Sequence, residues 1–250
     1  MELKDFLPLP RLESCKVLLC IQPHPDDNEV GAGATIAKLT QAGCTVVYLT
    51  VSDGRLGTLN PAVNPTDLVH IRKKEAEESS KILGVSRSIF LDFEDASYPD
   101  EAELAKSITS VIREVKPEIV MTVDPFLPYE AHPDHRKVGQ ASAEACLFSS
   151  FPHFRTKTDS PEEVWNISGI AFYNSACPNT FVNVDDTWNL KFEALAAHKS
   201  QFDKKTLEQY KDYFDFKSRQ YAEGRGFAHA EAFKLLTAAH LHCNTDTINL

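Results

Sequence analysis

The feature of this sequence that most constrains its fold is a regular alternation of short apolar runs with amphipathic stretches between residues 15 and 148. Continuous apolar or β-branched runs are typical of strands buried on both faces, and they occur at residues 17–21, 45–51, 88–91 and 119–123. The intervening segments have helical character, with glycine or proline near their ends, and predict helices over residues 29–41, 66–83, 100–116 and 135–148.

This alternation predicts a Rossmann-like α/β fold, with a mostly parallel sheet and helices on both of its faces. Residues 149–163 are polar and contain proline, which indicates a loop or insertion, whereas residues 167–173 and 180–184 are expected to form further strands. Residues 186–221 are helical by composition and include the aromatic-rich run 210–216, which we interpret as packing rather than as a binding platform.

Composition narrows the class of protein further. The chain has 250 residues, of which 42% are hydrophobic and 25% charged, as expected of a globular domain and not of a disordered chain. A net charge of −10 does not provide the basic surface that nucleic acids require, so we expect no nucleic-acid partner. No apolar run approaches the roughly 18 residues of a membrane span. The start lacks the order of a signal peptide, and the six scattered cysteines fit reduced thiols, so we expect a cytoplasmic protein.

Histidine and aspartate gather beside prolines directly after two of the predicted strands. Residues 22–29 follow the first strand, and residues 124–135 follow the fourth. In open α/β sheets, ligands bind outside the carboxyl ends of the strands, where the strand order reverses. In the common order 3-2-1-4-5, strands one and four are neighbours at that point, so we expect the two clusters to face one another.

These residue types favour a metal site. Imidazole and carboxylate groups are the ligands of catalytic zinc, which usually has three protein ligands and a water. Bound zinc lowers the pKa of water to about 7. A carboxylate beside the metal can then accept a proton, and a nearby histidine can stabilise an oxyanion or protonate a leaving group. The same ligands also accept ferrous iron, so zinc is expected and Fe²⁺ stays open.

With these motifs the sequence resembles the PIG-L/LmbE-like family of zinc-dependent deacetylases. The resemblance rests on Pro-His-Pro-Asp-Asp-Asn-Glu at residues 23–29 and on Ala-His-Pro-Asp-His at residues 131–135, and it extends to residues 50–54, 72–75, 191–201 and 230–233. It implies one deacetylase domain over residues 1–250, acting on a small molecule that contains N-acetylglucosamine. The sugar, its conjugate and the oligomeric state are not specified, although family members are often homo-oligomers.

The resemblance also implies roles for individual residues. His24, Asp27 and His135 would bind the zinc, and Asp26 would be the general base acting on the metal-bound water. His132 would protonate the amine leaving group or stabilise the oxyanion. Arg72 and Asp95 match positions that bind sugar hydroxyls, and His198 is expected either to line the site or to pack against it. Glu29 is expected to cap or buttress the loop rather than to act in catalysis.

One position departs from the family pattern. Some relatives carry a tyrosine two residues before the leaving-group histidine, where this chain has Glu130, and Tyr129 lies one residue earlier. Two alternatives follow from this difference. Either Tyr129 reaches the site from a shifted loop, or the site lacks a tyrosine.

Two other classes of function remain to be weighed against a hydrolase. Gly31-Ala32-Gly33 after a strand, with Asp53 ending the next strand, has some features of a dinucleotide-binding motif. However, Ile36 occupies the third glycine position, so we interpret Gly31 and Gly33 as sites of close helix packing. A non-catalytic binding module with a structural metal is also conceivable, but structural zinc sites usually have four protein ligands, often cysteines, and the cysteines here are far from both clusters.

Overall fold

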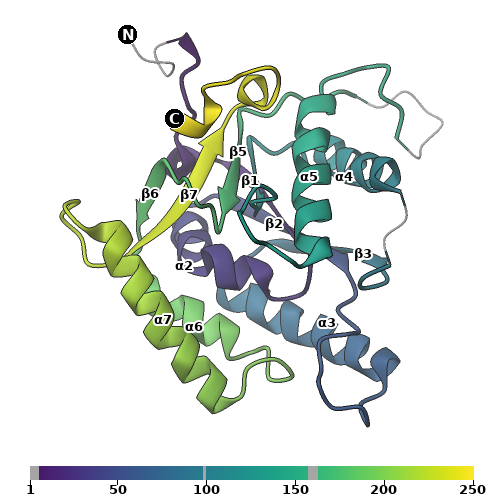
Figure 1. Ribbon diagram of the computed structural model, residues 1–250, viewed down its shortest axis with the longest axis vertical. Coiled ribbons are helices and arrows are strands. Elements are labelled where there is room, and N and C mark those ends of the chain that lie inside the picture. Colours follow the sequence, from purple (N-terminus) through teal and green to yellow (C-terminus); the bar gives the residue numbers. More distant parts are fainter. Residues whose placement is uncertain (1–5, 98–99, 157–162) are drawn as a thin grey trace.

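The computed structural model describes residues 6–97, 100–156 and 163–250 and contains a seven-stranded sheet with the order β3-β2-β1-β4-β5-β7-β6 (Figure 1). Neighbouring strands from β3 to β5 are parallel, whereas β7 is antiparallel to both β5 and β6. The bounds are β1 Val17–Gln22, β2 Thr45–Ser52, β3 Arg87–Phe93, β4 Ile119–Val123, β5 Gly169–Tyr173, β6 Thr180–Asn183 and β7 Ala230–Leu236. The predicted order 3-2-1-4-5 is therefore confirmed for the first five strands.

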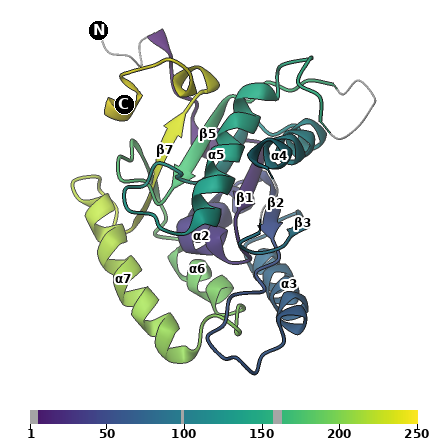
Figure 2. The ribbon, with the colours of Figure 1, turned by 45° about the vertical axis from the view of Figure 1, so that its right-hand side comes forward.

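Helices cover both faces of the sheet, as predicted. Helices α2 and α6 lie on one face and α4 and α5 on the other (Figures 1 and 2). Alternate residues of β1 enter two separate cores: Leu18 and Cys20 pack towards α2 and α6, whereas Leu19 and Ile21 pack towards α4 and α5. The bounds are α2 Asp27–Gln41, α3 Pro65–Ile82, α4 Glu101–Val115, α5 Pro133–Phe148, α6 Trp188–Leu195 and α7 Lys204–Ala222. No helix in the described part of the chain is both long and apolar enough to cross a membrane.

The structure differs from the sequence-based expectation mainly after residue 185. The region expected to be helical over residues 186–221 forms two helices, because the chain turns at residues 196–203 and Asp203 caps α7 by accepting a hydrogen bond from the Thr206 N–H. Strand β7 was not predicted. Of the expected insertion, residues 149–156 form a loop whose carbonyl groups accept hydrogen bonds from Arg113, and residues 157–162 lie outside the described part.

Gly31 lies inside α2, where it allows the helix to approach β5. A Cβ atom at Gly31 would lie 2.2 Å from the Tyr173 ring, and one at Gly33 would lie 3.2 Å from Lys191. Both glycines therefore serve helix packing, as interpreted from the sequence. Helix α2 already begins at Asp27, so Gly31 and Gly33 are not part of a phosphate-binding turn between strand and helix. The dinucleotide-binding motif considered from the sequence is therefore not formed by these glycines.

A buried ion pair joins α6 to β7 and contacts the backbone of α2. The Lys191 Nζ lies 2.6 Å from the Glu231 Oε1 and donates a second hydrogen bond to the Val30 carbonyl. The Glu231 carboxylate in turn accepts hydrogen bonds from the backbone N–H groups of Ala34 and Thr35. Breaking such a pair leaves a buried carboxylate without its counter-charge, which is far more costly than losing a surface ion pair.

We therefore expect Lys191→Met to lower the free energy of unfolding by about 3–5 kcal/mol. Lys73→Met is the matched control, because Lys73 pairs with Asp92 on the surface and its loss should cost less than about 1 kcal/mol. Urea denaturation measures both values. Adding Glu231→Gln to Lys191→Met should recover part of the loss, and equal effects of the two lysine variants would contradict this account of the pair.

Candidate metal centre

The two histidine- and aspartate-containing loops meet at the carboxyl edge of the sheet because β1 and β4 are adjacent parallel strands. Leu18 is paired with Ile119, and Cys20 with Met121, so the residues after each strand emerge side by side. Each loop leads directly into a helix: α2 begins at Asp27, and α5 begins at Pro133 after His132. The positive ends of both helix dipoles therefore face the same space, and they favour carboxylates and developing negative charge there.

His24, Asp27 and His135 come together as the sequence predicted. One ligand atom from each residue lies within 4.8 Å of the others. The His24 Nδ1 is 3.3 Å from the Asp27 Oδ2, and the His135 Nε2 is 3.4 Å from the Asp27 Oδ1. Two imidazoles and a carboxylate at this separation are a donor set that zinc or ferrous iron would accept, and all three residues line a cleft that is open to solvent.

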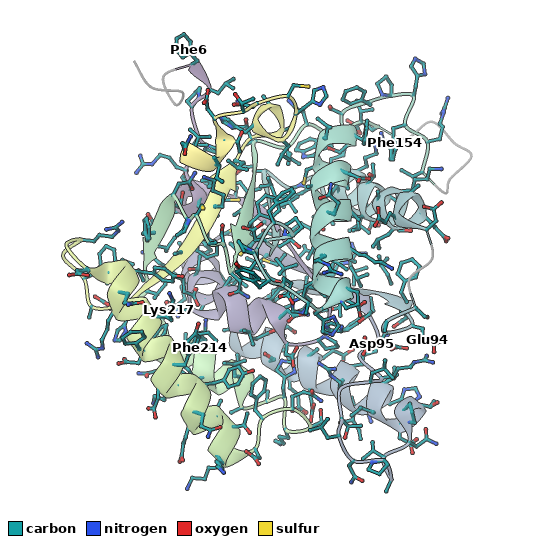
Figure 3. All side chains as sticks on the ribbon, viewed as in Figure 1. Phe6, Glu94, Asp95, Phe154, Phe214 and Lys217 are labelled. Atoms are coloured by element: carbon teal, nitrogen blue, oxygen red, sulfur yellow. The ribbon has the colours of Figure 1, made fainter. Side chains whose placement is uncertain are left out.

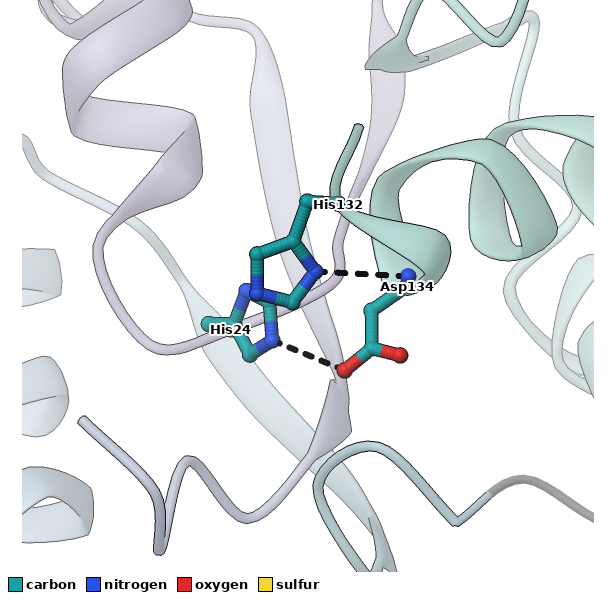
Figure 4. A group of neighbouring side chains, drawn as sticks. All are labelled: His24, His132 and Asp134. Atoms are coloured by element: carbon teal, nitrogen blue, oxygen red, sulfur yellow. Dashed lines mark hydrogen bonds and ion pairs between the residues drawn. The ribbon is translucent and has the colours of Figure 1, made fainter. Parts of the chain in front are cut away.

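Two buried carboxylates contact the Nε2 of His24, which is the ring nitrogen away from Asp27. Its Nε2 lies 3.1 Å from the Asp134 Oδ2 (Figure 4) and 3.2 Å from the Asp95 Oδ1. A proton on Nε2 satisfies these contacts and leaves the Nδ1 lone pair free on the side of Asp27. Carboxylates that fix the tautomer and orientation of a ligating histidine are a recurrent feature of metal centres.

A second set of three residues, His24, His132 and Asp134, also has ligand atoms within 4.8 Å of one another. We do not assign the metal to it, because the His132 Nδ1 accepts a hydrogen bond from the Asp134 backbone N–H at 3.3 Å (Figure 4). With Nδ1 acting as an acceptor, neutral His132 carries its proton on Nε2. His132 is then a hydrogen-bond donor towards the cleft, and neither of its nitrogens is free to bind a metal.

Glu130 supports both histidines of the second loop. Its Oε1 accepts the His132 backbone N–H at 2.8 Å, and its Oε2 lies 3.3 Å from the His135 Nδ1. A proton on the His135 Nδ1 leaves Nε2 free on the side of Asp27. Tyr129, by contrast, is fully exposed and has a backbone φ of 69°. Of the two alternatives for this position, the structure favours a site without the tyrosine.

We expect Glu130→Ala to weaken binding of the metal about 10–100-fold, because His135 loses the acceptor that fixes its tautomer. Competition with a chromophoric zinc chelator measures the affinity. Tyr129→Ala is the matched control at the neighbouring exposed position and should leave the affinity unchanged. An affinity that is the same in Glu130→Ala and in the unmodified protein would show that His135 does not depend on this contact.

Asp26 lies next to the candidate ligands but does not belong to their set. Its Oδ2 accepts a hydrogen bond from the Arg72 Nη2 at 3.1 Å. Burial raises the pKa of Asp26 to about 6, although the Arg72 guanidinium opposes this change. Its backbone φ of 144° is a conformation that favours glycine, and such strain typically persists where function requires it. Asp26 is therefore a half-buried carboxylate whose pKa suits proton transfer.

The excess of carboxylates around His24 and His135 also shapes their charge. Burial alone would lower the pKa of His24, but hydrogen bonds to Asp134, Asp27 and Asp95 raise it. In the same way, contacts with Asp27 raise the pKa of His135 against the effect of burial. Burial and the neighbouring imidazoles lower the pKa of His132. The centre thus stabilises positive charge at the two candidate ligands and keeps His132 neutral.

Arg72 and Asp95 reach the cleft, but most of their polar atoms are already occupied. Arg72 is 3% exposed and donates hydrogen bonds to the carbonyl groups of Pro25 and Gly54 in addition to Asp26. The Asp95 Oδ2 accepts the Leu56 backbone N–H, while Oδ1 faces His24. In the structure as it stands, both residues shape the loops around the ligands, and their predicted contact with sugar hydroxyls stays a prediction.

His198 does not line the cleft. It is completely buried behind the first loop, with its Nε2 3.8 Å from the Glu29 Oε2, and neither ring nitrogen has a hydrogen-bond partner within the described ranges. Burial lowers the pKa of His198 to about 3, so it is neutral. The predicted contact of His198 with substrate therefore needs correction. Of the two expected possibilities, His198 packs against the site, together with Glu29, which accepts a hydrogen bond from Ser79.

An open cleft of about 510 Å³ connects these groups to solvent. Its lining includes the three candidate ligands, the two predicted acid–base residues, Arg72 and Asp95, and one wall is formed by Asn174, Gln201, Phe202 and Tyr210. Asp134 and Glu130 were not identified from the sequence as functional residues. The only available signal for either was proximity to His132 and His135, because an acidic residue in a loop or first helical turn is usually a cap or a solvated group.

A Rossmann-like sheet with a His-Asp-His set at its carboxyl edge, flanked by a carboxylate and a neutral histidine, has the features of a metal-dependent hydrolase. Comparison with known proteins defines the family. The profile of the PIG-L family, described as GlcNAc-PI de-N-acetylase, matches residues 19–146. The chain belongs to this family of deacetylases.

Three relatives are especially informative. The chain is 39% identical to diacetylchitobiose deacetylase of Thermococcus kodakarensis over 228 residues, which are 91% of this chain and 85% of that protein. It is 32% identical to a probable N-acetyl-α-D-glucosaminyl L-malate deacetylase 2 of Bacillus cereus, over 74% of this chain and 83% of the relative. The solved structure of N,N'-diacetylchitobiose deacetylase from Pyrococcus horikoshii superposes with a TM-score of 0.91 at 34% identity, covering 99% of this chain and 95% of that one.

Proposed function

We propose that this protein hydrolyses the N-acetyl group of an amino sugar or of a small amino-sugar conjugate, with the help of a divalent metal. The observation that carries the proposal is that His24, Asp27 and His135 converge in one cleft that Asp26 and His132 also line. A structural metal site would need no such acid–base pair, and it is usually closed by a fourth protein ligand. The observed arrangement therefore favours an enzyme over a non-catalytic binding module.

His24 Nδ1, Asp27 and His135 Nε2 would hold the metal, which we propose to be zinc, with ferrous iron as the alternative. Such an ion supplies Lewis acidity towards the acyl oxygen and lowers the pKa of water. The protein itself contributes the orientation of the ligands. Asp134 and Asp95 hold His24, and Glu130 holds His135, so that the ligand geometry exists before substrate arrives.

Asp26 is the general base of the proposed reaction. Its carboxylate lines the cleft beside the ligands, and Arg72 fixes its orientation through one hydrogen-bonded ion pair. In the ionised form it can accept the proton that the attacking water loses as its oxygen bonds to the acyl carbon. Arg72 also keeps this carboxylate from being fully neutralised by burial, because the guanidinium opposes the rise of its pKa.

His132 is the proposed hydrogen-bond donor and general acid. Because its Nδ1 accepts from the backbone of α5, its Nε2 carries the proton towards the cleft. That N–H can stabilise the oxyanion of the tetrahedral intermediate. The amine needs a proton as the C–N bond breaks, and this is the proton that the attacking water gave to Asp26, passed on directly or through His132 in its imidazolium form. Acetate and the free amine are then the products. The exposed position of His132 allows it to exchange protons with solvent between turnovers.

The substrate class is proposed from the relatives, two of which are named for diacetylchitobiose. We further propose that residues 1–250 act as one catalytic domain in the cytoplasm, where the six free cysteines would stay reduced. The test is acetate release by the zinc-loaded protein from N-acetylglucosamine and from diacetylchitobiose, together with analysis of bound metal. We expect release that stops on treatment with a chelator and returns with added zinc. A protein that binds no divalent metal at micromolar concentration would refute the mechanism.

A further inference from the structure

The aromatic-rich run on α7 lies beside the cleft and not only in the core. A hollow of about 670 Å³ runs along this helix and is lined by Gln209, Tyr210, Tyr213, Phe214, Lys217 and Tyr221. It shares Val30, Asn174 and Tyr210 with the lining of the candidate catalytic cleft. The two hollows therefore adjoin, and we call the one along α7 the α7 groove. Figure 3 labels Phe214 and Lys217 on the helix that forms its wall.

The aromatic side chains of the α7 groove present ring surface to solvent. Tyr210 is 38% exposed and Tyr213 is 58% exposed, whereas Phe214 is half-buried between them. The ring centroids of Tyr210 and Tyr213 lie 5.7 Å and 5.4 Å from that of Phe214, so the rings support one another in edge-on contacts. These contacts make the rings a fixed aromatic surface. Residues 210–216 were interpreted from the sequence as packing residues, and this interpretation is incomplete.

The polar groups of the α7 groove are mostly neutral. Asn174, Ser175 and Gln209 contribute amide or hydroxyl groups, and the lining contains no carboxylate. The single cation, Lys217, lies 4.8 Å from the centre of the Tyr221 ring and is partly satisfied by it. A sugar ring has apolar C–H faces and a rim of hydroxyl groups, and this combination of aromatic surfaces and neutral polar groups matches it. A lipid chain or a strongly anionic group would leave one of these two features unused.

We propose that the α7 groove binds the sugar next to the N-acetylated residue, and that Tyr213 is a specificity-determining residue for disaccharides over monosaccharides. The inference rests on the proposed deacetylation. It adds that the acetylated sugar sits at the candidate metal centre while the adjoining neutral sugar extends past Tyr210 and stacks on the exposed ring of Tyr213. The shared lining at Val30 and Asn174 is where the glycosidic bond crosses between the two hollows.

The experiment compares kcat/KM for diacetylchitobiose with kcat/KM for the methyl glycoside of N-acetylglucosamine, which has the same linkage without a second ring. We expect the unmodified protein to prefer the disaccharide. Tyr213→Ala should lower this preference about tenfold, mainly through KM, because it removes the stacking surface. Tyr213→Phe keeps the ring and should keep the preference. Phe216→Ala is the matched control: Phe216 is an equally exposed aromatic residue of α7 that lines a different hollow.

Binding measured by calorimetry in the Asp26→Asn background separates this inference from the proposed reaction. If adding Tyr213→Ala to Asp26→Asn weakens binding of the disaccharide, the result supports sugar binding in the α7 groove. This holds even if no acetate is released from any substrate, and in that case only the deacetylation is refuted. The inference is overturned if the preference is unchanged in Tyr213→Ala. It is also overturned if Phe216→Ala lowers the preference as much as Tyr213→Ala does.

Discussion

Asp26→Asn is expected to lower kcat about 10²–10⁴-fold, because the amide cannot accept the proton of the attacking water. The substitution is nearly isosteric and leaves the branching of the side chain unchanged, so the strained backbone at φ 144° should persist. Acetate release under saturating substrate measures the effect. In the unmodified protein, activity should fall as the pH is lowered and the Asp26 carboxylate becomes protonated, and this dependence should be absent from the residual activity of the variant.

The control for this prediction is the metal content. Because Asp26 is outside the ligand set, Asp26→Asn should bind zinc as tightly as the unmodified protein does. Asp92→Asn is the matched substitution at an exposed aspartate that also has a positive φ, of 53°, and it should leave kcat unchanged. Full activity in Asp26→Asn would remove Asp26 as the base. Loss of zinc from this variant would instead place Asp26 among the ligands.

Asp27→Asn is expected to weaken zinc binding by more than about 100-fold, beyond the loss typical of an outer partner. Asp27 has a carboxylate oxygen beside each of the two candidate histidine ligands. Although burial alone would raise it, the pKa of Asp27 is held well below its usual range by the hydrogen bonds and charges of His135 and His24. An amide at position 27 removes the negative charge that stabilises a cation bound between the two imidazoles.

Chelator competition again gives the affinity, and acetate release should fall in parallel at limiting zinc. Adding excess zinc should restore part of the activity of Asp27→Asn but none of that of Asp26→Asn, which separates metal binding from proton transfer. If Asp27→Asn keeps its zinc while a substitution of Asp134 loses it, the metal belongs instead to the set formed by His24, His132 and Asp134.

The sequence was sufficient to predict the parallel part of the sheet, because strands buried on both faces leave continuous apolar runs. It was not sufficient for β7, since Ala230–Leu236 contains the charged residues Glu231 and Lys234, both of which are buried. Glu231 is compensated by Lys191, a residue of α6 that is distant in the sequence. A local sequence pattern cannot reveal a counter-charge on a distant residue. Prediction of a strand therefore fails where the burial of a charged residue depends on that counter-charge.

The candidate site was predictable to the extent that its residues follow strand ends. Strand adjacency placed His24 beside His135, and the prediction that their loops face one another is confirmed. The environment of each side chain was not predictable in this way. His198 lies in a turn after α6, and only the packing of that turn against Glu29 and α2 decides that its ring is buried. Likewise, the contacts of Glu130 depend on the conformation of the loop before α5.

The pairing of β1 with β4 has a consequence for how the chain holds together. His24 and Asp134, which lie in contact at the centre, are 110 positions apart in the sequence, and the candidate ligands come from both of these loops. An unfolded chain does not hold these loops near one another, so an ion bound there would link the two halves of the polypeptide. Its binding energy would add to the stability of the native state, and the melting temperature is then expected to rise with the concentration of the free metal.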